Sequence, residues 1–170
     1  ALYMIFQVIC DPADEVIIPV PFWVSFVEQV KLAGGRPVPV VTQRHQLDVD
    51  AIEQAVSPRT KAILINSPNN PTGALYGAET MDGIARVVQD HDLWLISDEV
   101  YDTQVWEGAH LSPRALPGMA ERTLTISSGG KTFHTTGWKI GWMTGPAPLV
   151  TAARTAASMP RFRSIGFMPA

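Results

Sequence analysis

The stretch KAILINSPNNPTG, residues 61–73, joins a short apolar run to a loop rich in asparagine and proline. A short apolar run bounded by turn-forming residues is typical of a strand buried on both faces of a parallel sheet. The polar residues begin where this strand is expected to end. Ligands bind at the carboxyl ends of strands in open parallel sheets, so the loop after residue 65 is a candidate site.

Outward from this stretch, short apolar runs alternate with longer amphipathic segments. The short runs predict further strands at residues 16–18, 36–41, 93–96 and 123–126. Apolar residues at helical spacing predict helices at residues 22–32, 47–56, 77–90 and 148–157, after a helix already under way at 1–6. Strands that alternate with helices predict a three-layer α/β/α fold with a mainly parallel sheet. Pro37 and Pro39 favour an edge position for their strand.

Chemically distinctive side chains follow several of these strands. They are, in chain order, Trp23, Asn70, Asp98, Tyr101, Ser128 and Lys131. Because the carboxyl ends of parallel strands share one edge, we expect these groups on one rim. A lysine in a partly desolvated site is a nucleophilic amine. Pyridoxal 5'-phosphate requires such a lysine and an acidic partner for its pyridine nitrogen, which Asp98 is placed to supply.

Three motifs, taken together, carry a resemblance to a known family. They are NSPNNPTG at 66–73, SDEVY at 97–101 and SGGKTFHTTGWKIG at 128–141. In sequence, order and spacing they resemble the class I/II aminotransferases, fold type I of the pyridoxal-phosphate enzymes. The resemblance extends over most of the chain and fades after about Ser158. It implies the three-layer α/β/α large domain of an aminotransferase, in incomplete form.

The resemblance implies specific roles for the residues that match its motifs. Lys131 is implied to form the Schiff base with the cofactor and to move the proton during catalysis. Asp98 is implied to pair with the pyridine nitrogen. Tyr101 and Asn70 are implied to hydrogen-bond the 3′-oxygen of the cofactor.

Three more residues complete the implied cofactor site. Trp23 is implied to stack on the cofactor ring, and Ser128 and Lys139 to contact the phosphate. Lys139 stands where many members of the family carry arginine, so it keeps the charge but not the bidentate fork. Ala13 stands where the family usually has a turn glycine, which predicts a small local cost if that turn needs a positive φ.

Each candidate also has a structural interpretation that the sequence leaves open. The alternatives are a helix cap for Asp98, turn residues for Asn70 and Ser128, packing aromatics for Trp23 and Tyr101, and solvated cations for Lys131 and Lys139. The other tryptophans, Trp106 among them, are interpreted as packing or interface residues.

The family's phosphate loop and N-terminal arm would precede Ala1, and its small domain would follow Ala170. We therefore expect residues 1–170 to be the central part of the cofactor-binding large domain of a longer enzyme. The family usually forms homodimers with the site at the subunit boundary. The charged fraction of 17%, against about 25% in ordinary domains, is consistent with a surface that another domain or subunit covers.

The expected function is transfer of an amino group from an L-amino acid to a 2-oxo acid. The segment around Lys139 favours the kynurenine, methionine or succinyldiaminopimelate-like subgroups. One alternative is a pyridoxal-phosphate-dependent β-lyase acting on cysteine conjugates. Another is a non-catalytic, ligand-sensing domain of a transcription regulator.

Composition argues against other classes of partner. The chain has 13 basic and 16 acidic residues without a basic stripe, so we expect no nucleic acid. The apolar-looking run at residues 16–24 contains two prolines and is too short for a bilayer, so we expect no membrane. The scattered histidines and the single cysteine, Cys10, predict no metal site. Cys10 is interpreted as a small core residue, and the expected location is the cytoplasm.

Overall fold

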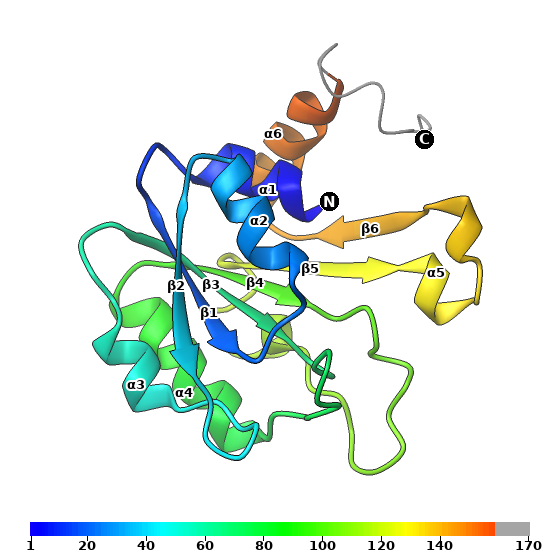
Figure 1. The fold of residues 1–170 in the computed structure, drawn as a ribbon, viewed down its shortest axis with the longest axis horizontal. Helices are drawn as coiled ribbons and strands as arrows, with labels where there is room; N and C mark the ends of the chain where they lie inside the picture. The colour runs from blue at the N-terminus through cyan, green and yellow to red at the C-terminus, as the bar shows by residue number, and fades with distance from the viewer. Residues whose placement is uncertain (159–170) are drawn as a thin grey trace.

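Six strands form a single sheet in the computed structural model, which describes residues 1–158 (Figure 1). The strands are β1 (Glu15–Val20), β2 (Arg36–Val41), β3 (Thr60–Asn66), β4 (Trp94–Asp98), β5 (Thr123–Ser128) and β6 (Gly141–Thr144). The α-helices are α1 (Leu2–Ile9), α2 (Ser25–Leu32), α3 (Val49–Gln54), α4 (Ala78–Asp90), α5 (Gly129–Thr132) and α6 (Ala147–Ser158). Two 3₁₀ turns are η1 (Pro113–Ala115) and η2 (Thr136–Trp138). The predicted domain range 1–170 also includes residues 159–170, which lie outside the described residues.

The sheet has the order β2-β1-β3-β4-β5-β6. Strands β1 to β5 run parallel to their neighbours, and β6 is antiparallel to β5. The predicted mainly parallel sheet is therefore confirmed, as is the edge position of β2. The chain passes from β1 outward to β2 and then returns to β3 on the other side of β1. This reversal makes the carboxyl ends of β1 and β3 a switch point, where ligands bind in such sheets.

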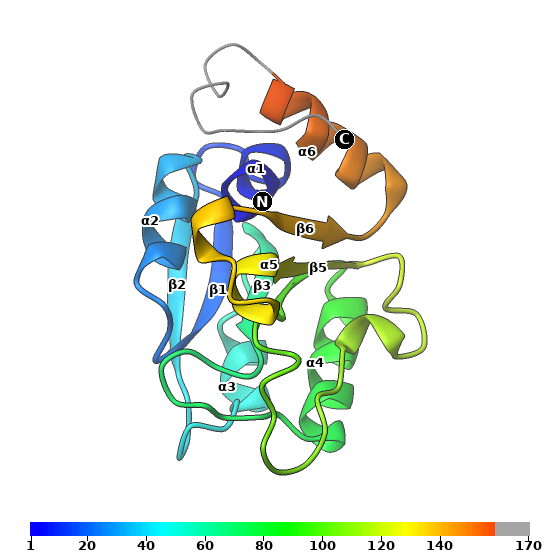
Figure 2. The same cartoon turned by 90° about the vertical axis from the view of Figure 1, so that its right-hand side faces the viewer.

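Helices cover both faces of the sheet, as Figures 1 and 2 show. Alternate residues of β1 face opposite layers. Val16 and Ile18 pack in the core with α1 and α2, and Ile17 packs in the core with α3 and α4. Phe6 is fully buried in the first of these layers. The three-layer α/β/α architecture is therefore confirmed.

The starting residues of α2 and α3 follow from a proline turn and a capping side chain. The helix predicted from Phe22 begins at Ser25, after the Val20–Pro21 turn segment. Asp48 caps α3 by accepting a hydrogen bond of 3.0 Å from the backbone N–H of Ala51. Strand β6 was not predicted. Its residues are mostly exposed, so they lack the buried apolar pattern that marks the other strands.

Glu15 ties three segments together at the amino end of β1. Its buried carboxylate accepts a hydrogen bond of 2.7 Å from Ser57 Oγ and pairs with the guanidinium of Arg36 on β2. The Ser57 hydroxyl and the Arg36 charge hold the pKa of Glu15 below its usual value. This network stabilises the amino-terminal side of the sheet, opposite the carboxyl ends of the strands that carry the candidate site.

Cys10 was predicted to pack as a small core residue. Cys10 is half-buried against the core of α1 and α2, and burial raises its pKa to about 11, as expected of a packing thiol. No helix among residues 1–158 is long and apolar enough to cross a membrane.

Candidate active site

The carboxyl ends of the central strands lie level with one another. In the register of the sheet, Asn66 on β3 pairs with Asp98 on β4, and Asp98 pairs with Ile126 on β5. The loops that leave these strands therefore start from one rim. The expectation that strands β3, β4 and β5 deliver their polar residues to one edge is confirmed.

Asp98 lies at the end of β4 and is buried. Its Oδ1 accepts a long hydrogen bond of 3.3 Å from the backbone N–H of Val100. Burial raises the pKa of Asp98 to about 6, the bond from Val100 opposes this rise, and the charge of Glu99 adds to it. A turn, and no helix, follows Asp98, so its alternative interpretation as a helix cap is wrong.

The loop after β3 is ordered by two other asparagines. Asn66 Oδ1 accepts a hydrogen bond of 2.7 Å from the backbone N–H of Asn70. Asn69 Oδ1 accepts from Thr72 Oγ1 at 2.9 Å, and Asn69 Nδ2 donates to the carbonyl of Pro21 at 3.4 Å. The last bond joins this loop to the loop after β1. Because Asn66 and Asn69 supply the side-chain bonds of the turn, the side chain of Asn70 is available to the neighbouring cavity.

A cavity of about 530 Å³ opens between the loop after β3 and the loop after β4. It is lined by Pro68, Asn69, Asn70, Pro71, Gly73, Leu75, Tyr101, Gln104, Val105, Trp106 and Glu107. Asn70 and Tyr101, both predicted site residues, thus share one cavity. Trp106 is 89% exposed on its wall. Of the two interpretations of Trp106, packing or interface, this exposure excludes packing in the core, and the interface interpretation stays a prediction.

Lys131 lies on the short helix α5, directly after β5. Its Nζ is 5.4 Å from the centroid of the Tyr101 ring, a cation–π arrangement. Its backbone carbonyl accepts a hydrogen bond of 3.1 Å from Gln104 Nε2. A Cβ at Gly130 would approach Thr136 Cα to 3.1 Å, so this position favours glycine beside the lysine. The structure therefore brings Lys131 to the loop that carries Tyr101, but it leaves Lys131 exposed, so the expected partial desolvation of this lysine is not seen in residues 1–158 by themselves.

The remaining predicted residues lie around this centre. The ring of Trp23 meets Phe26 edge-on at 5.5 Å and is 40% exposed, so Trp23 is not a core aromatic. Ser128 ends β5, and its side chain makes no capping bond to α5. Lys139 is exposed on the turn before β6 with a left-handed φ of 55°. The implied roles of Trp23, Ser128 and Lys139 toward a cofactor stay predictions.

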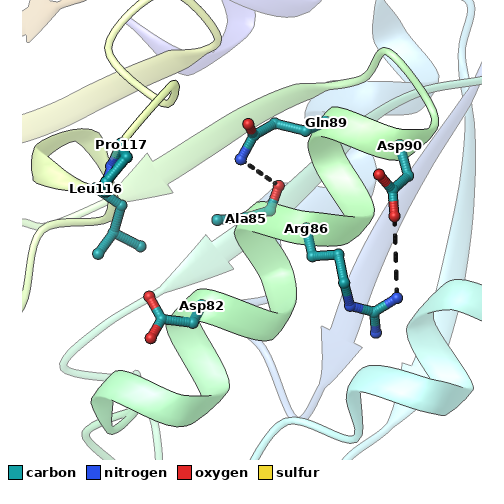
Figure 3. A pocket seen from close by; sticks show the side chains of 7 residues that line it. All are labelled: Asp82, Ala85, Arg86, Gln89, Asp90, Leu116 and Pro117. Atoms are coloured by element: carbon teal, nitrogen blue, oxygen red, sulfur yellow. Dashed lines mark hydrogen bonds and ion pairs between the residues drawn. The ribbon is translucent and has the colours of Figure 1, made fainter.

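A second hollow, of about 280 Å³, lies on the outer surface of α4 (Figure 3). Three of its four polar side chains already have partners, and Asp82 is the exception among the described residues. Arg86 pairs with Asp90 at 4.0 Å, and Gln89 Nε2 donates to the Ala85 carbonyl at 3.1 Å. None of the predicted site residues lines this hollow. It also lies away from the strand ends, so we take the rim of β3, β4 and β5 as the candidate site.

Sequence reasoning missed several residues of the rim. Gln104 contacts the Lys131 backbone, and His110 and Ser112 contact Glu99. These residues lie between the recognisable motifs, in a loop whose path the local sequence does not determine. Among residues 1–158, no group of three or more His, Cys, Asp and Glu side chains is placed to hold a metal ion.

The carboxyl rim of this mainly parallel α/β sheet thus brings together a lysine, a phenol and a buried carboxyl, at the edge where such sheets bind ligands. The family model described as aminotransferase class I and II matches residues 1–165. The chain belongs to that family.

The comparisons with individual proteins agree with the family. The aspartate/prephenate aminotransferase of Thermus thermophilus is 44% identical over 162 residues, which cover 93% of this chain and 41% of that protein. A solved structure titled as a single mutant of Thermus thermophilus aspartate aminotransferase has a TM-score of 0.90 at 42% identity, covering 95% of this chain and 42% of that one. The solved structure of N-succinyldiaminopimelate aminotransferase from Mycobacterium tuberculosis has a TM-score of 0.88 at 42% identity, covering 91% of this chain and 42% of that one. The chain thus spans about two fifths of the length of these relatives.

Proposed function

We propose that this chain is part of the large domain of a pyridoxal-phosphate-dependent aminotransferase that moves an amino group from an L-amino acid to a 2-oxo acid. The observation that supports this most directly is the approach of Lys131 Nζ to the Tyr101 ring, on the rim that also buries Asp98. The fold shared with solved aminotransferases supports it further. The β-lyase and the ligand-sensing regulator have no comparable support among the relatives.

The residues of the rim fit the cofactor that this family generally uses, pyridoxal 5'-phosphate. Asp98 is a buried carboxyl whose ionised form is disfavoured, so a cationic ring nitrogen would be a matching partner. The amide of Asn70 and the phenol of Tyr101 line the same cavity and can both donate to one oxygen. When bound, the cofactor supplies an electron sink for the carbon that loses its proton.

The chain's own residues would then move the proton and keep the ring nitrogen of the cofactor protonated. The Lys131 amine would take the proton from the α-carbon of the substrate and return it to the neighbouring carbon of the cofactor, because a flexible amine at the rim would reach both. Asp98 would keep its partner nitrogen protonated by direct charge pairing. The Tyr101 ring stabilises Lys131 while it is cationic, and the hydrogen bond from Gln104 fixes the backbone that presents it.

The finer expectations belong to the same proposal. The segment around Lys139 supports a kynurenine-, methionine- or succinyldiaminopimelate-like substrate. Relatives named for aspartate and for succinyldiaminopimelate are almost equally similar, so overall identity does not choose between substrates. We propose a cytoplasmic homodimer in amino acid biosynthesis. Exposed Phe133, Trp138 and Trp142 on the projecting β5–β6 hairpin are consistent with a covering subunit or domain (Figure 1).

The test is uptake of pyridoxal 5'-phosphate by the 170-residue chain, followed by borohydride reduction and mass spectrometry. We expect a near-visible absorbance band and a reduced adduct on Lys131. The Lys131→Ala variant should lose both. Lys61→Ala is the matched control, because Lys61 is an exposed lysine at the amino end of β3, away from the carboxyl rim. This variant should keep the absorbance band and the reduced adduct. Equal labelling of all three proteins would overturn the assignment of Lys131.

A further inference from the structure

The side chain of Glu99 does not face water, although it directly follows the candidate site residue Asp98. It is 6% exposed. One carboxylate oxygen accepts a hydrogen bond of 2.8 Å from Ser112 Oγ, and the other lies 2.9 Å from His110 Nε2. An ionised carboxylate only accepts, so it selects the His110 form that carries a proton at Nε2. Both oxygens of this buried acid are therefore used by one short segment.

That segment is the returning end of the cavity-lining loop, which we define as residues 101–112. The loop leaves the sheet after Glu99, contributes Tyr101, Gln104 and Trp106 to the cavity, and comes back at His110. Glu99 itself is fixed to the sheet, because its backbone N–H donates to the Ile126 carbonyl of β5 at 2.8 Å. A residue anchored to the sheet thus holds the far end of the loop.

The other side of the loop is fastened to the neighbouring α5. Gln104 Nε2 donates to the Lys131 carbonyl, and the Tyr101 ring faces Lys131 Nζ. Both contacts are at the surface, where single polar bonds are weak and exchange readily with water. By contrast, the Glu99 carboxylate is buried and its two bonds are part-buried, and a buried carboxylate strongly favours keeping its partners in place.

We propose that Glu99, His110 and Ser112 form a clamp that positions the cavity-lining loop, so that Tyr101 and Gln104 are held against Lys131. The three are positioning residues, since they act through Tyr101 and Gln104. What the cavity holds rests on the proposed function, whereas the clamp is a property of the protein without any ligand. The clamp explains why an acid follows Asp98 on the rim, despite the unfavourable effect of its charge on the ionisation of Asp98.

The first test measures amide hydrogen exchange across residues 101–111 in the cofactor-free protein. Glu99→Gln removes the carboxylate charge and His110→Ala removes the donor to it, and we expect exchange in the loop to rise about tenfold in each while the central strands keep their protection. Glu121→Gln replaces an exposed acid outside the loop and serves as the matched control. Unchanged loop exchange in folded Glu99→Gln and His110→Ala would overturn the clamp.

A milder substitution tests the clamp if the Glu99 and His110 variants do not fold. Ser112→Ala removes one hydroxyl from the Glu99 carboxylate, and we expect loop exchange to rise about threefold. Exchange equal to that of the unchanged protein would then overturn the proposal.

The second test asks whether the clamp positions Tyr101 rather than merely stabilising the fold. In protein loaded with pyridoxal 5'-phosphate, we expect Ser112→Ala to move the pH midpoint of the bound cofactor's absorbance by about half a unit, because the Tyr101 hydroxyl is displaced. Faster loop exchange with an unmoved midpoint would reduce the clamp to a structural role and overturn the positioning. If the unchanged protein takes up no cofactor, the proposed function fails, and the exchange experiment still decides the clamp.

Discussion

The ammonium nitrogen of Lys131 lies 5.4 Å from the centroid of the Tyr101 ring. The two residues come from loops that follow different strands, β5 and β4, and are far apart in the sequence. Their meeting depends on the level ends of these parallel strands, because a shift in register would move one loop away from the other. The sheet therefore brings the two loops within reach of each other, and the loops set the distance between the amine and the ring.

Substitutions of Tyr101 separate the contribution of the ring from that of the hydroxyl. Tyr101→Phe keeps the cation–π contact and removes the hydroxyl, so we expect the affinity for pyridoxal 5'-phosphate to fall about three- to tenfold. Tyr101→Leu removes both the ring and the hydroxyl, so the affinity should fall further, by about another factor of three. Absorbance titrations give the dissociation constants. Tyr3→Phe on α1 is the control, and equal affinity of all variants would contradict a role for Tyr101 in the site.

Asp98 should make the stability of the cofactor-free protein depend on pH. Burial raises its pKa from 3.8 to about 6 in the folded state, so the folded protein binds its proton more tightly than the unfolded chain. The associated stability is present below pH 3.8 and is lost as the pH rises through about 6. Asp98→Asn cannot ionise and should therefore gain stability over the original protein across this window, by roughly 3 kcal/mol once the pH exceeds 7.

Urea unfolding of both proteins between pH 4 and pH 8 measures this difference. Asp82→Asn replaces an exposed aspartate on α4 and should show a small difference at every pH. A constant difference between the original protein and Asp98→Asn would mean that Asp98 is not desolvated. Adding pyridoxal 5'-phosphate should reverse the order, because a cationic partner favours the ionised carboxyl.

The parts of this fold that could be predicted from sequence are those with local signals. The run at 61–65 predicted β3, and the residues after it predicted a loop at the rim. Both predictions are possible because a buried strand and a turn each depend on the types of residues that are adjacent in the sequence. Pro37 and Pro39 likewise predicted the edge strand β2. Asn70 and Tyr101 were named from motifs, and the structure places both in one cavity.

The parts that could not be predicted depend on contacts between distant residues. His110 meets Glu99 only because the loop between them returns to the sheet, and nothing in the local sequence determines that path. Strand β6 lacks an apolar pattern because its residues are exposed, and its pairing with β5 is its main structural signal. The sequence left packing and interface both open for Trp106, and only the path of its loop shows that it lies outside the core.

Ala13 offers a test of backbone strain. It stands in the turn between α1 and β1 with a φ of 69°, a left-handed conformation that side chains with a Cβ disfavour. The turn cannot relax freely, because the N–H of Ala13 donates to the Gly34 carbonyl at 3.0 Å and the N–H of Asp14 donates to the Asp11 carbonyl at 3.0 Å. The turn therefore meets the condition, a positive φ, under which the sequence predicted a small local cost for alanine at this position.

Ala13→Gly should therefore stabilise the protein, which is the reverse of the usual effect of glycine. Relief of the left-handed strain is worth about 1–2 kcal/mol, and the greater freedom of glycine in the unfolded chain offsets about half of it, leaving a gain of about 0.5–1 kcal/mol. Ala51→Gly in α3 is the matched control and should lose about 1 kcal/mol, since Ala51 lies in a helix. Urea unfolding at neutral pH measures both. A loss of stability in both variants would show that the turn tolerates a Cβ without strain, because only the unfolded-state effect of glycine would then remain.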